Sequence, residues 1–277
     1  MNKFSNPLNA FIESAFSPKP YKIGIALSGG GIKGMCHAGV LKALEEAGVK
    51  PDIISGVSAG AIVGALYADG HSPDEIAEIF EHVEFRKMTK LQVPDGGFFR
   101  TERFEKYLGS KLRAKTFEDL KIPLKIVATN LDRGESVTFS SGKLLPVIMA
   151  STTVPILFPP RKINSENYVD GGVFKNFPVS IIRDECEYLI GINASPLVVT
   201  EYKKSILNIA MRTYNFMFKA NIIADKAMCD FLIEPVDMGN YDTFETEKSR
   251  EIYELGYHTA RELIQEQLKQ LKMTKTQ

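Results

Sequence analysis

Two short apolar segments constrain the fold of this 277-residue chain most strongly, because each one is followed at once by small residues and then by a helical pattern. Residues 21–27 run into three glycines, and residues 52–57 run into Ser58. Apolar spacing predicts helices over 35–47 and 59–69, directly behind these two turns. This strand–helix–strand–helix order is typical of a parallel sheet with right-handed crossovers.

The remainder of the chain continues the α/β pattern without a repeat, a low-complexity segment or a Gly/Ser linker. We therefore expect an irregular leader over 1–20 and one α/β domain over 21–277. Further strands are predicted at 124–130, 136–140, 188–193 and 231–236, further helices at about 73–83, 101–112, 203–228 and 246–272, and a loop at 94–97.

Composition excludes several classes of function. Lys and Arg number 34 and Asp and Glu number 34, so the formal net charge is zero and the basic excess of a nucleic-acid-binding protein is missing. The three cysteines, Cys36, Cys186 and Cys229, form no CxxC pair, which argues against a disulfide framework and a structural metal site. No apolar run approaches the length of a membrane span and the first 20 residues lack a signal-peptide core, so we expect a cytoplasmic protein.

The second turn is a G-x-S-x-G motif, GVSAG at 56–60. Its serine, Ser58, lies between a predicted strand and a predicted helix, on a sharp turn that needs small neighbours such as Gly56 and Gly60. The N–H groups at the start of the next helix favour an oxygen that is losing its proton. The alternative is that both glycines only permit tight packing. The strand–turn–helix context favours Ser58 as a nucleophile.

The first turn, GGGIKG at 29–34, fits two functions. Gly29, Gly31 and Gly34 match the dinucleotide-binding pattern G-x-G-x-x-G, but the second strand ends without the acidic residue that would hold a ribose. A P-loop is excluded because no GK[ST] follows. Consecutive glycines also leave backbone N–H groups unhindered, as an oxyanion hole requires. The turns follow consecutive strands, so we expect loop and serine to face one carbonyl.

A nucleophilic serine needs a base, and the four histidines are poor candidates. His71 and His82 flank a predicted helix, His258 lies within a charged helix, and His37 fits a packed helix position. Asp170, in the sequence YVDGG, is followed by two glycines, so its carboxylate would stand at a tight turn and could take a proton from a serine. In isolation, the sequence favours an ordinary Asp-Gly turn over a base at Asp170.

Taken together, these motifs resemble the patatin-like phospholipase family. The resemblance covers about 21–195, in both order and spacing, and weakens beyond about 200. Its blocks are LSGGGIKG at 27–34, continued by His37 and by GVL at 39–41; GVSAG at 56–60; ASTTVP at 150–155 with FPP at 158–160; DGGV at 170–173 with Asn176 and PV at 178–179; and two linking segments, FEDL at 117–120 and VATN at 127–130.

The resemblance implies a three-layer α/β/α sandwich around a mainly parallel central sheet, and a Ser–Asp dyad that works without histidine. It makes Ser58 the nucleophile and Asp170 the general base. It implies that lipid esters are cleaved, at or near a membrane interface, without a metal or another cofactor. Two departures, Ser28 before the glycines and Asp-Gly-Gly in place of Asp-Gly-Ala, are minor. The resemblance assigns the oxyanion hole to Gly29, Gly30, Gly31 and Gly34. It assigns positions that support these motifs to Lys33, Gly56, Gly60, Gly171 and Gly172.

Some positions in the sequence fit more than one role. Apolar side chains at 155–158 and 211–218 could meet acyl chains or a membrane, or pack in the core. Lys33 could orient the glycine loop, approach a lipid phosphate or lie in solvent. A patatin fold kept for regulation or lipid binding, with little catalysis, remains an alternative to an acyl hydrolase. A dinucleotide enzyme is a weaker one. Neither the head group nor the oligomeric state can be read from the sequence.

Overall fold

The computed structural model describes residues 18–81, 90–91, 96–196, 204–243 and 245–274. Most of the expected leader, the last two residues of the helix predicted at 73–83, and the first two of the loop predicted at 94–97 lie outside these ranges.

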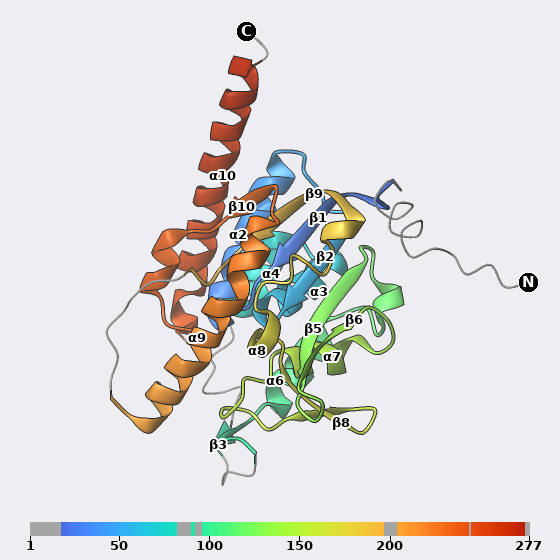
Figure 1. The fold of residues 1–277 in the computed structure, drawn as a ribbon, viewed down its shortest axis with the longest axis vertical. Coiled ribbons are helices and arrows are strands. Elements are labelled where there is room, and N and C mark those ends of the chain that lie inside the picture. Colours follow the sequence, from blue (N-terminus) through green and yellow to red (C-terminus); the bar gives the residue numbers. More distant parts are fainter. Residues whose placement is uncertain (1–17, 82–89, 92–95, 197–203, 244, 275–277) are drawn as a thin grey trace, which may run out of the picture.

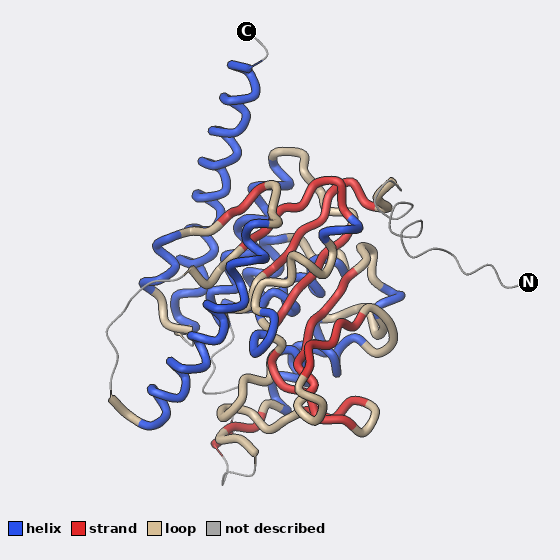
Figure 2. Tube along the Cα trace, in the orientation of Figure 1, coloured by secondary structure: helices blue, strands red, loops and turns tan. Residues whose placement is uncertain are grey.

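A sheet that is 8-stranded within the described residues forms the centre of the molecule (Figures 1 and 2). Its order is β10-β9-β1-β2-β5-β8-β7, and β6 pairs with β5 outside this path. The pairings from β10 to β5 are parallel, and those of β6, β7 and β8 are antiparallel. The strands are β1 (Tyr21–Leu27), β2 (Ile53–Val57), β5 (Leu124–Asn130), β6 (Glu135–Phe139), β7 (Arg161–Ile163), β8 (Glu166–Asp170), β9 (Cys186–Ile192) and β10 (Phe231–Ile233); β3 (Lys90–Leu91) and β4 (Phe99–Arg100) form a separate pair.

Helices cover both faces of this sheet, because its buried strands alternate between two apolar clusters. In β1, Ile25 and Leu27 join the larger cluster, and Ala26 between them joins the smaller one. The larger cluster packs against α2 (Met35–Glu46), α3 (Ala59–Ala68), α4 (Pro73–Glu81), α6 (Glu102–Lys111), α7 (Leu144–Ser151) and α10 (Ser249–Thr274). The smaller cluster packs against the segment after α8 (Gly172–Lys175) and against α9 (Ile206–Ala227). Short 3-10 helices lie at Gly31–Gly34, Phe117–Asp119, Arg183–Glu185, Val236–Asn240 and Thr246–Lys248.

The three-layer arrangement confirms the expected fold class, and most predicted elements are present. The structure has β1 and β5 with the predicted bounds, and α2, α3 and β2 within one residue of them. The prediction missed α7, β7 and β8, and it gave no hint that the sheet turns antiparallel after β5. That change of direction decides where the site forms.

Two strands meet end to end along one edge of β5. β2 runs parallel to it as far as the pair Val57–Val127, and β8 runs antiparallel to it as far as the pair Ala128–Asp170. β6 covers the same part of β5 as both, so it occupies the opposite edge. The carboxyl ends of β2 and β8 therefore point at each other across adjacent residues of β5.

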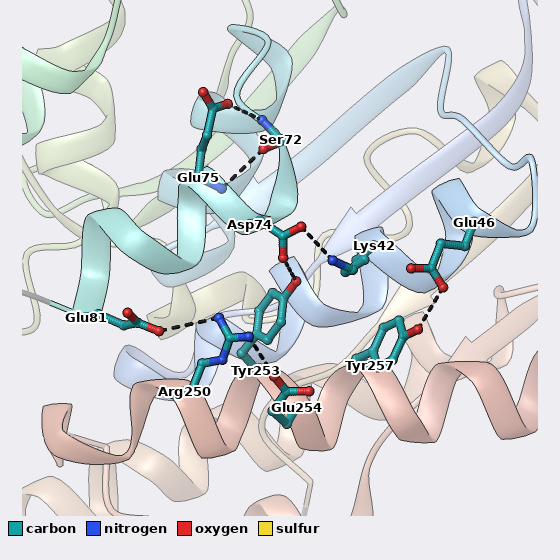
Figure 3. Close-up of polar contacts among 10 residues, drawn as sticks. All are labelled: Lys42, Glu46, Ser72, Asp74, Glu75, Glu81, Arg250, Tyr253, Glu254 and Tyr257. Atoms are coloured by element: carbon teal, nitrogen blue, oxygen red, sulfur yellow. Dashed lines mark hydrogen bonds and ion pairs between the residues drawn. The ribbon is translucent and has the colours of Figure 1, made fainter.

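The C-terminal helix α10 is fastened to α2 and α4, and its far end projects beyond the body of the molecule (Figure 1). Figure 3 shows the polar contacts on this side. Asp74 accepts hydrogen bonds from the Tyr253 hydroxyl at 2.6 Å and from Lys42 Nζ at 2.5 Å, which links all three helices. Tyr257 donates to Glu46 at 2.8 Å. Because α2 starts directly after the glycine loop, this packing supports the loop.

Gly256 of α10 allows the close approach to α2. A β-carbon at this position would overlap the backbone of Cys36, which cannot move aside as the end of a side chain can. Alanine normally stabilises an exposed helix relative to glycine by about 1 kcal/mol. We expect Gly256→Ala to lower the free energy of unfolding instead, by about 1–3 kcal/mol, as overpacking does. Urea unfolding measures this change.

Gly109 of α6 provides the matched control. A β-carbon there would meet only the terminal Cδ2 of Leu145, at 2.8 Å, and that atom can rotate away. Gly109→Ala should therefore be neutral or stabilising. Equal effects of the two substitutions would show that α10 does not depend on close backbone packing.

Candidate active site

Ser58 occupies the turn between β2 and α3, with φ 52° and ψ −121°. A side chain in this left-handed region is strained, at a cost of about 1–3 kcal/mol, and persists only where surrounding contacts hold it. The residue is 8% exposed. Its hydroxyl donates a hydrogen bond of 2.7 Å to Oδ2 of Asp170, which lies 112 positions further along the chain. The two residues predicted as nucleophile and base are thus in direct contact.

Ser151, at the end of α7, supports the junction where β2 and β8 meet. Its hydroxyl donates to the Val127 carbonyl at 2.6 Å and accepts from the N–H of Ser58 at 2.9 Å. The Ser151 side chain thus hydrogen-bonds two backbone groups at the junction, where neither β2 nor β8 continues its pairing with β5. Gly171 stands against the Val127 backbone, where a side chain would not fit. Ser151 belongs to the ASTTVP block at 150–155, and its sequence alone indicates no role for it.

Asp170 is buried, with only 1% of its surface exposed. Its other oxygen, Oδ1, accepts the N–H of Gly172 at 2.8 Å, which fixes the carboxyl plane. Burial raises the pKa of Asp170 from 3.8 to about 7, against the opposing effects of the Ser58 hydroxyl, the Gly172 N–H and Tyr214. A carboxylate with a pKa near neutrality can take and return a proton.

The glycine loop lies beside the nucleophile. A β-carbon built on Gly29 would lie 3.3 Å from Cβ of Ser58. The two turns come close because α3 starts against the end of β1, where Gly60 faces the carbonyl groups of Leu27 and Ser28 without room for a side chain. Gly34 faces Ala59 across the same contact, and Gly56 faces Gly60.

Two backbone N–H groups of the glycine loop donate hydrogen bonds to carbonyl groups elsewhere in the protein. Gly29 donates to the Asn176 carbonyl at 3.0 Å, and Ile32 donates to the Thr243 carbonyl at 2.9 Å. The Gly29 N–H, which is expected from the sequence to face a substrate oxygen, is thus bound to the Asn176 carbonyl in this structure. Gly30 and Gly31 precede the first internal hydrogen bond of the 3-10 helix, so the helix itself supplies no carbonyl for their N–H groups. Those two groups are the better oxyanion donors.

The three histidines that the structure describes take no part in this contact. His37 is buried in α2, with Nε2 2.8 Å from the Ser28 carbonyl, and burial lowers its pKa to about 4. A neutral His37 thus supports the start of the glycine loop. His71 lies against the Lys111 carbonyl, His258 is exposed on α10, and His82 falls outside the described residues.

The remaining candidate residues differ in their surroundings. Lys33 is half-buried; burial lowers its pKa, and the nearby charge of Asp242 acts in the opposite direction. Within the two apolar segments, Leu157, Phe158 and Tyr214 are buried, and Ile156, Phe216 and Met217 are exposed. In the described part of the chain, no helix is long and apolar enough to cross a membrane, and no group of three His, Cys, Asp or Glu side chains could hold a metal ion.

Several residues that hold the site lie beyond the region where the sequence motifs are clear. Thr243 anchors the glycine loop, the Ser195 hydroxyl donates to the Gly29 carbonyl at 2.8 Å, and Tyr214 stands beside Asp170. None has a motif of its own. Only the tertiary structure reveals these contacts.

Comparisons with known proteins show which proteins this chain is similar to. The model of the patatin-like phospholipase family matches residues 25–182, which include Ser58 and Asp170. The "Uncharacterized protein YqhO" of Bacillus subtilis is 29% identical over 251 residues, covering 76% of this chain and 86% of that protein. Lysophospholipase NTE1 of Kluyveromyces lactis is 26% identical over 294 residues, covering 93% of this chain and 20% of the yeast protein.

Two further similarities concern a human protein and a solved structure. Human patatin-like phospholipase domain-containing protein 6 is 26% identical over 272 residues, covering 85% of this chain and 20% of its own length. This chain therefore spans about a fifth of the yeast and human relatives. The crystal structure of VipD from Legionella pneumophila matches with a TM-score of 0.51 and 17% identity, over 90% of this chain and 68% of that chain. At that identity the likeness shows the fold alone.

Proposed function

The chain belongs to the patatin-like phospholipase family, and from this premise we propose that it is a serine hydrolase that cleaves carboxylic esters of lipids without a catalytic metal ion. The observation that supports this most directly is the 2.7 Å hydrogen bond from the Ser58 hydroxyl to the buried Asp170 carboxylate. A nucleophile in hydrogen-bond contact with a base, on a strained turn beside a glycine loop, is the arrangement that acyl transfer needs.

The reaction would proceed in two steps through an acyl-enzyme. Asp170 takes the proton of Ser58 as the serine oxygen attacks the ester carbonyl, and the N–H groups of Gly30 and Gly31 hold the negative oxygen of the tetrahedral intermediate. The intermediate collapses, and Asp170 gives the proton to the departing alcohol. Asp170 then takes a proton from water, whose oxygen attacks the acyl group on Ser58, and returns that proton to the serine oxygen as the acid leaves.

A lipid surface is the proposed setting of this reaction. Exposed apolar side chains follow one side of α9, namely Ile206, Ile209, Phe216, Met217 and Ile223. On a helical wheel Ile209, Phe216 and Ile223 lie opposite the face that holds Tyr214, Asn221 and Asp225, and Ile206 and Met217 lie at its side. An exposed apolar helix face beside a lipid-cleaving site is suited to contact with acyl chains at an interface.

A fluorophosphonate probe and an ester panel test the proposal. The protein should take up one probe molecule, mapped to Ser58 by peptide mass spectrometry, and chelator should change neither labelling nor turnover. Short p-nitrophenyl esters and phospholipid vesicles, compared at equal acyl concentration, separate plain esterase activity from interfacial lipid hydrolysis. A chain that is neither labelled nor active on any of these substrates would instead favour a regulatory or lipid-binding role.

Activity should depend on pH through the base. Asp170 must be ionised to accept the serine proton, and its pKa is about 7. We therefore expect kcat/KM to rise with pH up to about 7 and then to level off, with one proton lost. An acid limb near pH 4, where an ordinary carboxyl group titrates, would contradict the assignment of Asp170 as a buried base.

A further inference from the structure

α9 lies against the segment that follows the proposed base, and its polar side chains bind the backbone of that segment. Asn221 donates to the Gly172 carbonyl at 3.1 Å and accepts from the N–H of Asn176 at 3.0 Å. One helical turn later, Asp225 accepts from the N–H of Ser180 at 2.7 Å. This helix lies outside the 25–182 family match, yet it fixes the strand end that carries Asp170.

Tyr214 lies on the same face of α9, two turns before Asn221. The residue is 6% exposed, and its phenol oxygen is buried. Burial and the neighbouring Asp170 carboxylate both raise the pKa of the phenol well above its ordinary value. Tyr214 therefore stays protonated, and its O–H is a donor to a carboxylate.

The groups around the Asp170 carboxylate indicate what Tyr214 does there. The carboxylate accepts hydrogen bonds from the Ser58 hydroxyl of the β2–α3 turn and from the Gly172 N–H of α8, and Tyr214 of α9 lies beside it. The nearby Lys175 is 3.0 Å from Asp225, to which it is ion-paired. Hydrogen-bond donors stabilise the negative charge of a buried carboxylate.

We propose that Tyr214 is a positioning residue for the base: its phenol donates to the Asp170 carboxylate, so that Oδ2 keeps facing Ser58 and the group stays ionised for proton transfer. The inference deepens the proposed function and rests on Asp170 being the base. It also assigns α9 a part in catalysis, although the helix contributes neither the nucleophile nor the oxyanion donors.

Tyr214→Phe removes the donor and keeps the ring that fills the space. A hydrogen bond to a charged group shifts a pKa by roughly one unit or more, so the acid limb of kcat/KM should move upward by about one pH unit. At pH 6.5 this lowers kcat/KM by about 5–10-fold. Above the limb the activity should return to within about 3-fold of wild type, with KM unchanged. Activity lowered equally at every pH would indicate a packing role and overturn the proposal.

Tyr253→Phe is the matched control. This tyrosine is also buried and also donates to a carboxylate, that of Asp74, but it lies on α10 against α2 and α4. Its substitution should leave the acid limb in place. Should Tyr214→Phe fail to fold, which circular dichroism would reveal, Tyr214→Met replaces it as a variant that lacks the hydroxyl.

A second readout does not depend on turnover. The 13C NMR signal of the Asp170 carboxyl, assigned by its disappearance in Asp170→Asn, reports the pKa of this group directly. An upward shift in Tyr214→Phe supports the inference even if wild type proves inactive, in which case only the proposed function fails. Active protein with an unmoved carboxyl titration overturns the role of Tyr214 and leaves the proposed function standing.

Discussion

Replacing Ser58 with alanine is expected to lower kcat on an ester substrate by at least ~10⁴-fold, because the substitution removes the atom that forms the acyl-enzyme. Fluorophosphonate labelling should disappear as well. Hydrolysis of a p-nitrophenyl ester, followed by absorbance at saturating substrate, measures the loss. The alanine has to adopt the same left-handed backbone as the serine, so the strain of the turn remains.

Ser55→Ala is the control for this experiment. Ser55 is a buried serine of the same strand, and its hydroxyl donates to the Pro178 carbonyl at 2.7 Å, away from Asp170. Its loss should cost stability but leave kcat within a few-fold of wild type. Esterase activity that survives in Ser58→Ala, with folding verified by thermal unfolding, would rule out the proposed mechanism.

Asp170→Asn should lower kcat by about 10²–10⁴-fold, since the amide keeps the shape of the carboxyl group but cannot take a proton. The rate of fluorophosphonate labelling should fall with it, because both depend on deprotonation of Ser58. Stopped-flow labelling at pH 8, where wild-type Asp170 is ionised, gives the clearest comparison. Unchanged labelling would show that another group acts as the base.

The same substitution has a predictable effect on stability. The folded-state pKa of Asp170, about 7, exceeds its unfolded value near 3.8. Folded protein therefore holds a proton that unfolded protein releases, and wild-type stability falls as pH rises between about 4 and 7. The asparagine side chain of the variant carries no such charge in either state. The gain in melting temperature of Asp170→Asn over wild type should grow from pH 5 to pH 8, and an equal gain at both values would contradict the buried-base assignment.

The sequence predicted the two turns well because the signals at both turns are local. A strand that ends in glycines or in GVSAG, with a helix directly after it, places Ser58 and the glycine loop on neighbouring turns by chain connectivity alone. The predicted bounds of β1, β2, α2 and α3 agree with the structure within a residue for this reason.

The contact between Ser58 and Asp170 could not be predicted from local signals. It depends on β8 running antiparallel along β5, and the short β7–β8 hairpin has no clear alternating pattern. Pairing in a sheet is set by distant partners, so Asp170 looked like an Asp-Gly turn until the family resemblance pointed to it. The hydrogen bond from the Gly29 N–H also has a distant partner, because Asn176, whose carbonyl accepts it, follows β5 in the sequence.

The end-to-end meeting of β2 and β8 also determines when the candidate site can form during folding. Neither strand contacts the other along its length; both are aligned by β5, so the site exists only after three segments spread over more than 100 positions have joined one sheet. Pairings this distant in sequence form late, since loop closure must precede them. As the chain emerges from the ribosome, Ser58 is made long before Asp170 and α9. A partly synthesised chain thus has Ser58 without Asp170, so the proposed dyad cannot form before synthesis has passed β8.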